Sequence, residues 1–219
     1  MLEYRLVRTN RKTVSVSLDE FGALSVYAPK GMPKKDIDAI VEKKESWITR
    51  KREQLKYVET ALPPERLDGY SFYLFGEPCQ IVETDGGKIR YDSEEKKLYL
   101  PKGEGQAEIV AWLKELAYFV MKGITDKWAQ IMGVSYTSLQ INNPKSYWGG
   151  CTQKNGLKYT FRILYAPSVV MEYLAVHELA HIRHKNHSRW FWAEVEKYCP
   201  DWYFKRKWLR DRKILFRIF

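Results

Sequence analysis

Residues 168–188 read SVVMEYLAVHELAHIRHKNHS, and this stretch decides how the rest of the chain is understood. Apolar residues recur at helical spacing up to His177, and Ser168 stands where a helix N-cap is expected. All four histidines of the chain lie within this stretch, between positions 177 and 187. Because His177 and His181 are four residues apart, a helix places their rings on one face, within reach of a single zinc ion.

Glu178 has the position of a catalytic base beside this pair. On a helix it is turned by about 100° from His177, too far to join the same chelate but close enough to reach a water at the metal. Zinc with three protein ligands keeps a fourth position open, and a water there has its pKa lowered toward about 7. The pattern therefore predicts a zinc-dependent hydrolase in which Glu178 takes a proton from that water and hands it to the leaving nitrogen.

The third ligand is a choice between His184 and His187. A helix continued through His184 would spread three ligands over about 10 Å of its axis, which fits one ion poorly. His187 is favoured because the Lys-Asn pair between the two histidines can turn the chain back, since Asn tolerates the left-handed conformation that ends helices. A second helix is then expected to begin at Arg189, with Ser188 as its cap.

The first hundred residues are expected to be mostly β. Residues 13–18 and 24–28 alternate in polarity and predict a hairpin, and Pro33 begins a helix expected over 33–57. The segment 61–69 contains two prolines and a glycine, so it is the best candidate for a linker. Four further short strands are expected at residues 72–75, 79–83, 88–91 and 97–100.

A long helix and a small sheet are expected before the histidine stretch. An apolar stripe predicts a helix over 106–132, and a strand is expected at 139–142, followed by a turn at 145–151. The next strand, 157–163, alternates apolar and polar residues. Its expected buried residues are Leu157, Tyr159, Phe161 and Ile163, and its expected outward residues are Lys158, Thr160 and Arg162.

Composition describes a globular protein and sets bounds on where it works. Of 219 residues, 45% are apolar and 15% aromatic, which is more apolar surface than a disordered chain carries. No run of about eighteen apolar residues and no leader-like N-terminus is present, so the expected location is the cytoplasm. The odd, widely separated cysteines Cys79, Cys151 and Cys199 argue against a disulfide framework and are expected to pack rather than bind metal.

The charge of the chain is +10, and part of it is concentrated at the end. Residues 201–219 contain seven Lys or Arg against two Asp, a local balance of +5. Such a basic segment can track the phosphates of a nucleic acid. The favoured interpretation is an amphipathic helix whose Trp208, Leu209 and Arg212 pack on the body of the protein.

Several aromatic residues are expected near the site. Residues 190–192 are expected to pack behind it, and Tyr147 with Trp148 to wall the cleft. Tyr147 or Tyr159 is a candidate for stabilising an oxyanion.

Seven short motifs are spread over most of the chain. They are RKTV at 11–14, AP at 28–29, KESWI at 44–48, WGGC at 148–151, YLAVHELAH at 173–181, NHS at 186–188 and FW at 191–192. Together they resemble the YgjP-like metallopeptidases, a group related to the zincins and to the SprT-like proteins. The tryptophan motif of that family usually reads WGSC, so Gly150 stands here where the family has a serine.

The resemblance implies a site and two activities. His177, His181 and His187 would be the zinc ligands and Glu178 the catalytic residue, as the spacing also predicts. A peptidase acting on a polypeptide is favoured, with the substrate pairing along the edge of the strand that ends at Ile163. The alternative is a nucleotide pyrophosphatase on the same metal, an activity attributed to a member, although no Gly-rich phosphate loop or acidic cluster for magnesium is evident.

The expected fold is α+β. Residues 1–103 are expected to form a mostly β N-terminal region with the helix 33–57. Residues 104–219 are expected to form a zincin-like, largely helical catalytic domain with a small antiparallel sheet beside the zinc helix. The sequence predicts no membrane partner and gives no sign of the oligomeric state.

Overall fold

The computed structural model describes residues 2–18, 23–50, 52, 63–144 and 146–219. The chain divides into two compact units, Met1–Ala61 and Leu62–Phe219, each with its own hydrophobic cluster. This division does not coincide with the expected boundary at 103/104. It falls instead inside the segment that was the best linker candidate.

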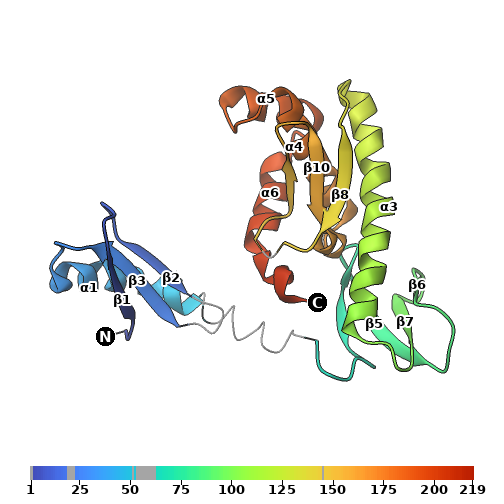
Figure 1. Cartoon of the computed structure of the whole chain (residues 1–219), viewed down its shortest axis with the longest axis horizontal. Helices are drawn as coiled ribbons and strands as arrows, with labels where there is room; N and C mark the ends of the chain where they lie inside the picture. Colours follow the sequence, from blue (N-terminus) through green and yellow to red (C-terminus); the bar gives the residue numbers. More distant parts are fainter. Residues whose placement is uncertain (1, 19–22, 51, 53–62, 145) are drawn as a thin grey trace. The chain divides into compact units, whose positions relative to one another are not determined.

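The smaller unit contains a three-stranded sheet in the order β1-β3-β2 (Figure 1). Its strands are β1 (Arg5–Thr9), β2 (Ser15–Leu18) and β3 (Leu24–Pro29). β2 pairs antiparallel with β3, with Val16 opposite Val26, so the predicted hairpin is confirmed; its loop, 19–22, lies outside the described residues. β1 runs parallel to β3 and was not predicted from the sequence.

The helix predicted over 33–57 is interrupted by a turn at residues 43 and 44. α1 spans Lys34–Glu42 and is followed by a turn, after which residues 45–50 are helical again. The break occurs because the N–H of Lys44 bonds to the carbonyl of Val41, three residues back, and so tightens the last turn. Residues 51 and 53–57 lie outside the described part of the chain.

The larger unit begins with a four-stranded sheet in the order β4-β5-β7-β6. Its strands are β4 (Ser71–Leu74), β5 (Glu77–Thr84), β6 (Arg90–Asp92) and β7 (Lys97–Pro101), close to the four predicted segments. Phe75 and Gly76, both at positive φ, form the β4–β5 turn. A Cβ on Gly76 would lie 2.7 Å from the ring of Pro167, so this turn packs directly against the start of the next helical layer.

This sheet shares one core with the helices that follow, which explains why the division lies before it. Phe72, Leu74 and Ile81 are buried in the same cluster as the inner residues of the later helices. The first of these, α3 (Gln106–Met132), matches the predicted long helix and ends at Gly133 in the left-handed conformation.

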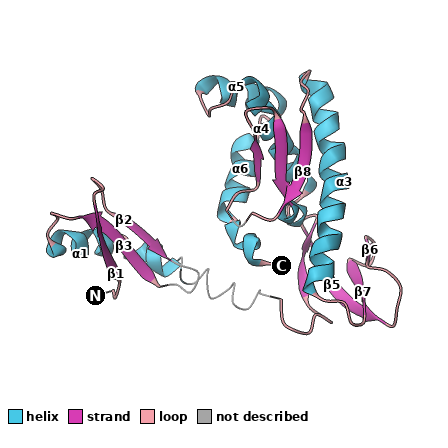
Figure 2. Ribbon diagram, viewed as in Figure 1, coloured by secondary structure: helices cyan, strands magenta, loops and turns pink. Residues whose placement is uncertain are grey.

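A second small sheet lies beside α3 (Figures 1 and 2). Its strands are β8 (Ser138–Asn142), β9 (Gly149–Cys151) and β10 (Gly156–Thr160), in the order β8-β10-β9. The α+β class is confirmed, but this sheet is mixed rather than antiparallel, because β8 and β10 run parallel. β9 forms within the segment that was expected to be a turn.

The strand predicted over 157–163 ends early. After Thr160 the chain enters the 3-10 helix η1 (Phe161–Tyr165), whose second residue, Arg162, donates its N–H to the Thr160 hydroxyl. Thr160 and Arg162 are both fully buried rather than outward, and the Nε of Arg162 donates to the carbonyl of Ile218 at 3.1 Å. The expected burial of the apolar residues from Leu157 to Ile163 is confirmed.

Three helices and a final 3-10 turn complete the larger unit. They are α4 (Ser168–Arg183), α5 (Arg189–Tyr198), α6 (Trp202–Asp211) and η2 (Lys213–Arg217). α4 contacts α3, β9, α5 and α6, so it is enclosed by the rest of the unit. No helix in the described part of the chain is long and apolar enough to cross a membrane.

Candidate metal centre

Helix α4 brings the first two histidines together. Pro167 is its N-cap and Ser168 its first residue, so the cap lies one residue earlier than predicted and no side chain bonds there. His177 and His181 follow on one face of the helix, with ring centroids 5.1 Å apart. Residues on the other faces are buried, so this histidine pair is fixed to a rigid element of the core.

The third imidazole comes from the loop after the helix. α4 ends at Arg183, and His184 is extended, with φ −129° and ψ 99°. The chain then turns back, and the His187 ring lies 5.1 Å from the His177 ring and 4.7 Å from the His181 ring, centroid to centroid. Of the two candidates for the third ligand, the structure therefore gathers His187, while the group of potential ligands in the described residues leaves His184 out.

The geometry of the three rings fits one metal ion. Their potential ligand atoms all lie within 4.8 Å of one another, and the Nε2 atoms of His177 and His187 are 3.1 Å apart. In a tetrahedral site with bonds of about 2.1 Å, neighbouring ligand atoms are roughly 3.4 Å apart. Small movements therefore suffice to place all three nitrogens on one ion.

The loop that carries His187 turns differently from the prediction. Asn186 is not in the left-handed conformation; its Oδ1 instead accepts the N–H of Ser188 at 3.2 Å. Ser188 precedes α5 as its N-cap residue, as expected, although its side chain makes no cap bond. Lys185 ties the loop to the β9–β10 turn by donating to the carbonyl of Thr152 at 3.0 Å and to Asn155 Oδ1 at 2.6 Å.

Neighbouring groups orient two of the rings. The Nδ1 of His181 lies 2.9 Å from the carbonyl of His184, so that nitrogen must carry the proton, which leaves Nε2 free. The Nδ1 of His177 lies 3.4 Å from the hydroxyl of Tyr173, one turn earlier on the same helix. Tyr173 was not predicted to take part, although a spacing of four residues is the signal that places it on the histidine face.

Aromatic rings enclose the cluster on one side. The Phe191 ring lies 4.9, 4.4 and 4.7 Å from the rings of His177, His181 and His187. Trp192 stacks on the His187 ring at 5.5 Å and carries the guanidinium of Arg206 at 4.6 Å. The prediction that these residues pack at the site is confirmed for Phe191 and Trp192, whereas Trp190 is 61% exposed.

The environment of the histidines favours their neutral form. Burial lowers the pKa of His177 to about 3, and the charges of His181, His187 and Arg206 add to the shift. Burial also lowers the pKa of His181 and of His187. Because a metal binds the neutral imidazole, the rings are in the state that coordination requires.

Glu178 is a buried carboxyl beside the cluster. It is 3% exposed, and burial raises its pKa to about 8. Its Oε2 has no hydrogen-bond partner among the described residues. Buried polar groups are nearly always bonded, so an orphaned oxygen here fits a water, a substrate or a metal-site partner that belongs beside it.

Strand β9 provides the space that Glu178 occupies. A Cβ on Gly149 would lie 2.8 Å from Glu178 Oε1, so the carboxyl fits because this residue is glycine. A Cβ on Gly150 would meet nothing within 4 Å, so the serine expected from the resemblance would also fit there. From the sequence, Gly150 was singled out but Gly149 was not. The role of Gly149 could not be predicted, because its neighbour, Glu178, is on a different element, α4.

The free edge of β9 is available for pairing in the described structure. Trp148 and Thr152 bond to β10 through their backbones, and bonded pairs alternate along an antiparallel ladder. The N–H and C=O groups of Gly149 and Cys151 therefore point away from β10. The strand ending at Ile163 was expected to offer the edge, but β10 is central and paired on both sides.

The other aromatic candidates have different surroundings from those expected. Tyr159 is fully buried with its hydroxyl 3.3 Å from Thr125 Oγ1, which excludes it as an oxyanion donor in this conformation. Trp148 is buried, donates from Nε1 to the carbonyl of Leu209 and packs on Phe216 at 4.3 Å, so it braces the sheet rather than walling a cleft. Tyr147 remains an exposed candidate.

The basic C-terminal segment folds as a helix against the body. On α6, Leu209 is buried and Trp208 is partly buried against the core, as the amphipathic interpretation predicts. The guanidinium of Arg212 lies over the Trp208 ring at 4.6 Å. Phosphate binding by this segment stays a prediction. The three cysteines are free thiols, and none belongs to the histidine cluster.

Comparisons with known proteins identify a family for the chain. A family model described as the YgjP-like metallopeptidase domain matches residues 12–212, which include all the residues of the cluster. Comparison with curated proteins and with solved structures gave no significant match. The match extends over nearly the whole sequence, and the chain belongs to the YgjP-like metallopeptidase-domain family.

Proposed function

We propose that the chain is a zinc-dependent peptidase in which His177, His181 and His187 hold the ion and Glu178 is the general base. The observation that carries the proposal is the gathering of three imidazoles whose potential ligand atoms lie within 4.8 Å of one another, next to a buried carboxyl with an unbonded oxygen. Zinc suits a site of three imidazoles without sulfur ligands. When bound, it supplies Lewis acidity toward a carbonyl oxygen and toward water.

Glu178 moves the proton in this proposal. Burial raises the pKa of Glu178, so its carboxyl can hold a proton that it takes from the attacking water. The unbonded Oε2 is the atom free to accept that proton. Glu178 then delivers the proton to the amide nitrogen that leaves, while Gly149 keeps the space in which the carboxyl sits.

The edge of β9 supports a polypeptide substrate. An extended peptide can add to a free strand edge through backbone hydrogen bonds. The outward N–H and C=O groups of Gly149 and Cys151 are suitable partners, and Gly149 lies against Glu178. A substrate held along β9 therefore has its backbone close to the catalytic carboxyl.

The test combines metal analysis with cleavage of an unfolded polypeptide such as reduced casein. We expect about one zinc per chain, and in Glu178→Gln the zinc should stay while cleavage falls at least about 100-fold. His181→Ala should lose the metal. His184→Ala is the matched control, because the mutation leaves the His184 carbonyl in place, and it should keep both zinc and activity. Cleavage by Glu178→Gln at the wild-type rate contradicts the proposal. So does a loss of zinc from His184→Ala while His181→Ala keeps its zinc.

A nucleotide pyrophosphatase on the same metal is the second candidate. The observation in its favour is a cation near the cluster: the Arg206 guanidinium lies 4.6 Å from the centre of the Trp192 ring, which stacks on His187. Against it, the described residues contain no carboxylate cluster for magnesium. If the zinc-loaded protein releases no pyrophosphate from a panel of nucleoside triphosphates, this candidate is excluded.

A further inference from the structure

The sheet of the smaller unit has one covered face and one open face. Alternate residues of its central strand, Leu24, Val26 and Ala28, are buried in a cluster with Ile37 of α1. The residues between them face the other way, and Tyr27 is 36% exposed. The side chains on the open face do not contribute to the hydrophobic core, so they are available to contact solvent or a ligand.

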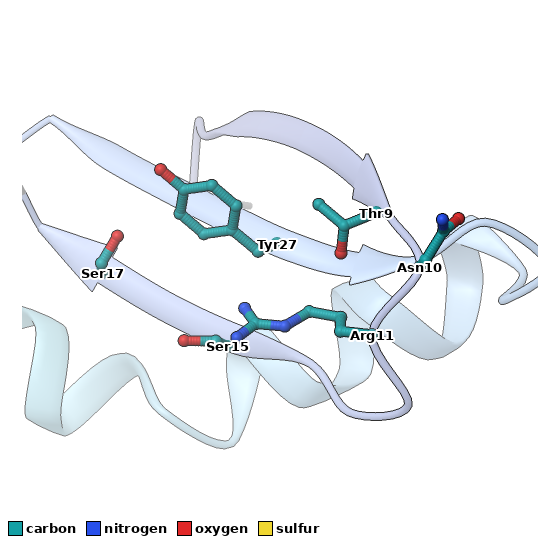
Figure 3. Close-up of a pocket in the computed structure, with 6 residues that line it drawn as sticks. All are labelled: Thr9, Asn10, Arg11, Ser15, Ser17 and Tyr27. Carbon is teal, nitrogen blue, oxygen red and sulfur yellow. The ribbon is translucent and has the colours of Figure 1, made fainter.

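A hollow of about 500 Å³ lies on this open face (Figure 3). Its volume is in the range of small-molecule binding sites. The residues that line it are Thr9, Asn10, Arg11, Ser15, Ser17 and Tyr27. Arg11 reaches back along the strands in the figure, toward the ring of Tyr27 and the hydroxyl of Ser15.

The lining of this hollow suits an anion. It contains an arginine, three aliphatic hydroxyls, a phenol and an amide, but no carboxylate. Arg11 has no ion-pair partner among the described residues. The Oγ1 of Thr9 is shielded from solvent and has no hydrogen-bond partner there either. Guanidinium and hydroxyl donors are the groups that proteins place around phosphate.

Tyr27 adds a flat surface beside the cation. The Arg11 guanidinium carbon lies 5.8 Å from the centre of the Tyr27 ring. An aromatic ring beside a phosphate-binding arginine can stack on a nucleobase. Such stacking is possible with any base, because every base has a π face. The ring therefore favours a nucleotide unit over a plain inorganic anion or an acidic protein surface.

Further positive charge extends along the same region. The segment RLVRTNRK at residues 5–12 contains four cations and no acidic residue; of the four, Arg8 alternates to the covered side, opposite Ala28, and donates to the carbonyls of Pro29 and Met32. Arg5 lies opposite Ser25 in the β1–β3 register and, by alternation with the inward Leu6, is on the open face. Charge that continues beyond one phosphate site is what a strand of nucleic acid would use.

We propose that the open face of the smaller unit binds single-stranded nucleic acid, with a phosphate on Arg11 and the surrounding hydroxyls and a base stacked on Tyr27. This goes beyond the proposed peptidase activity, since it assigns a separate ligand to a unit that contains none of the metal-centre residues. The binding site also differs from the basic segment at 201–219.

Fluorescence anisotropy of the full chain with a labelled 20-residue oligothymidylate tests the proposal. We expect binding that weakens steeply as salt is raised. Arg11→Gln should weaken binding about tenfold and reduce the salt dependence, and Tyr27→Ala should weaken it by a similar factor. Tyr27→Phe, which keeps the ring, should stay near wild type. Lys88→Gln is the charge-matched control, an exposed cation of the larger unit, and it should bind like wild type.

Several outcomes overturn this proposal. Wild-type affinity in both Arg11→Gln and Tyr27→Ala removes the site, and so does a full chain that shows no binding at low salt. Equal losses in Arg11→Gln and Lys88→Gln mean that net charge alone is responsible. Loss of binding in Lys205→Gln with Lys207→Gln, while Arg11→Gln binds normally, assigns nucleic acid to the C-terminal segment instead. The proposed peptidase activity is not affected by any of these results.

Discussion

Helix α4 and the sheet β1-β3-β2 place their polar groups in opposite ways. α4 is enclosed on several sides, so its residues Glu178, His177 and His181 lie in fixed positions, with little spare volume around the Glu178 carboxyl. The small sheet is covered on one face, and its hydroxyls and Arg11 point to an open hollow. A reaction that requires a dry carboxyl suits the first environment, whereas binding of a large, charged partner suits the second. The comparison shows that the degree of burial of a polar side chain is a better guide to its function than its chemical type.

The largest expected effect comes from filling the space beside Glu178. In Gly149→Ala the new methyl carbon would lie 2.8 Å from Glu178 Oε1, so the carboxyl or β9 must move. If Glu178 is the general base, as proposed, we expect a displacement of this size to lower turnover by about 100-fold. Casein cleavage and zinc content measure the effect, and we expect zinc to be retained.

Gly150→Ala is the matched control for this change, since its methyl group meets nothing within 4 Å. It should cleave casein close to the wild-type rate. If both variants lose activity equally, general damage to β9 explains the result. The close contact between residue 149 and Glu178 is then not the cause of the loss.

The second prediction concerns the smaller core. Ile37 is fully buried on α1, and Ile37→Ala leaves a cavity that lowers the free energy of unfolding of this unit by about 3 kcal/mol. Because each unit has its own hydrophobic cluster, we expect the peptidase activity and the unfolding of the larger unit to stay unchanged. Denaturant unfolding followed by hydrogen exchange separates the two units. A shared shift of both would show that they unfold together.

The smallest expected effect is on the affinity for metal, when the hydroxyl group that contacts His177 is removed. Tyr173→Phe removes the hydroxyl 3.4 Å from His177 Nδ1 and keeps the ring that packs there. Loss of such a partner weakens metal binding at least about tenfold, and the long distance here places the effect at that lower end. Competition with a zinc chelator measures the affinity. An unchanged affinity would mean that the enclosure by Phe191 alone orients this ring.

The sequence predicted what local patterns encode. The helix that carries His177 and His181 follows from apolar periodicity, and the choice of His187 over His184 follows from the length of a helical turn. The β2–β3 hairpin and the strands of the first sheet in the larger unit also follow from alternation. These features depend on residues close together in the chain.

Features that depend on distant partners were missed or mistaken. Arg162 alternates with apolar residues and was expected to face outward, but its partners include Phe219, 57 residues away. Gly149 has a role only because Glu178 arrives from another element. β1 pairs parallel with β3 and carries no alternating signal of its own. The division of the chain at 61/62 depends on which core the first sheet of the larger unit joins, and periodicity contains no such information.

The carbonyl of His184 has a consequence for how the metal is acquired. By accepting from Nδ1 of His181, it selects one tautomer of that ring and keeps the Nε2 lone pair free. We therefore expect metal binding to depend on the peptide group at position 184 and to tolerate the loss of its imidazole. The entropic cost of ordering the His181 ring is therefore met in part when the chain folds and not when the ion binds. The affinity for metal then depends on the stability of the fold.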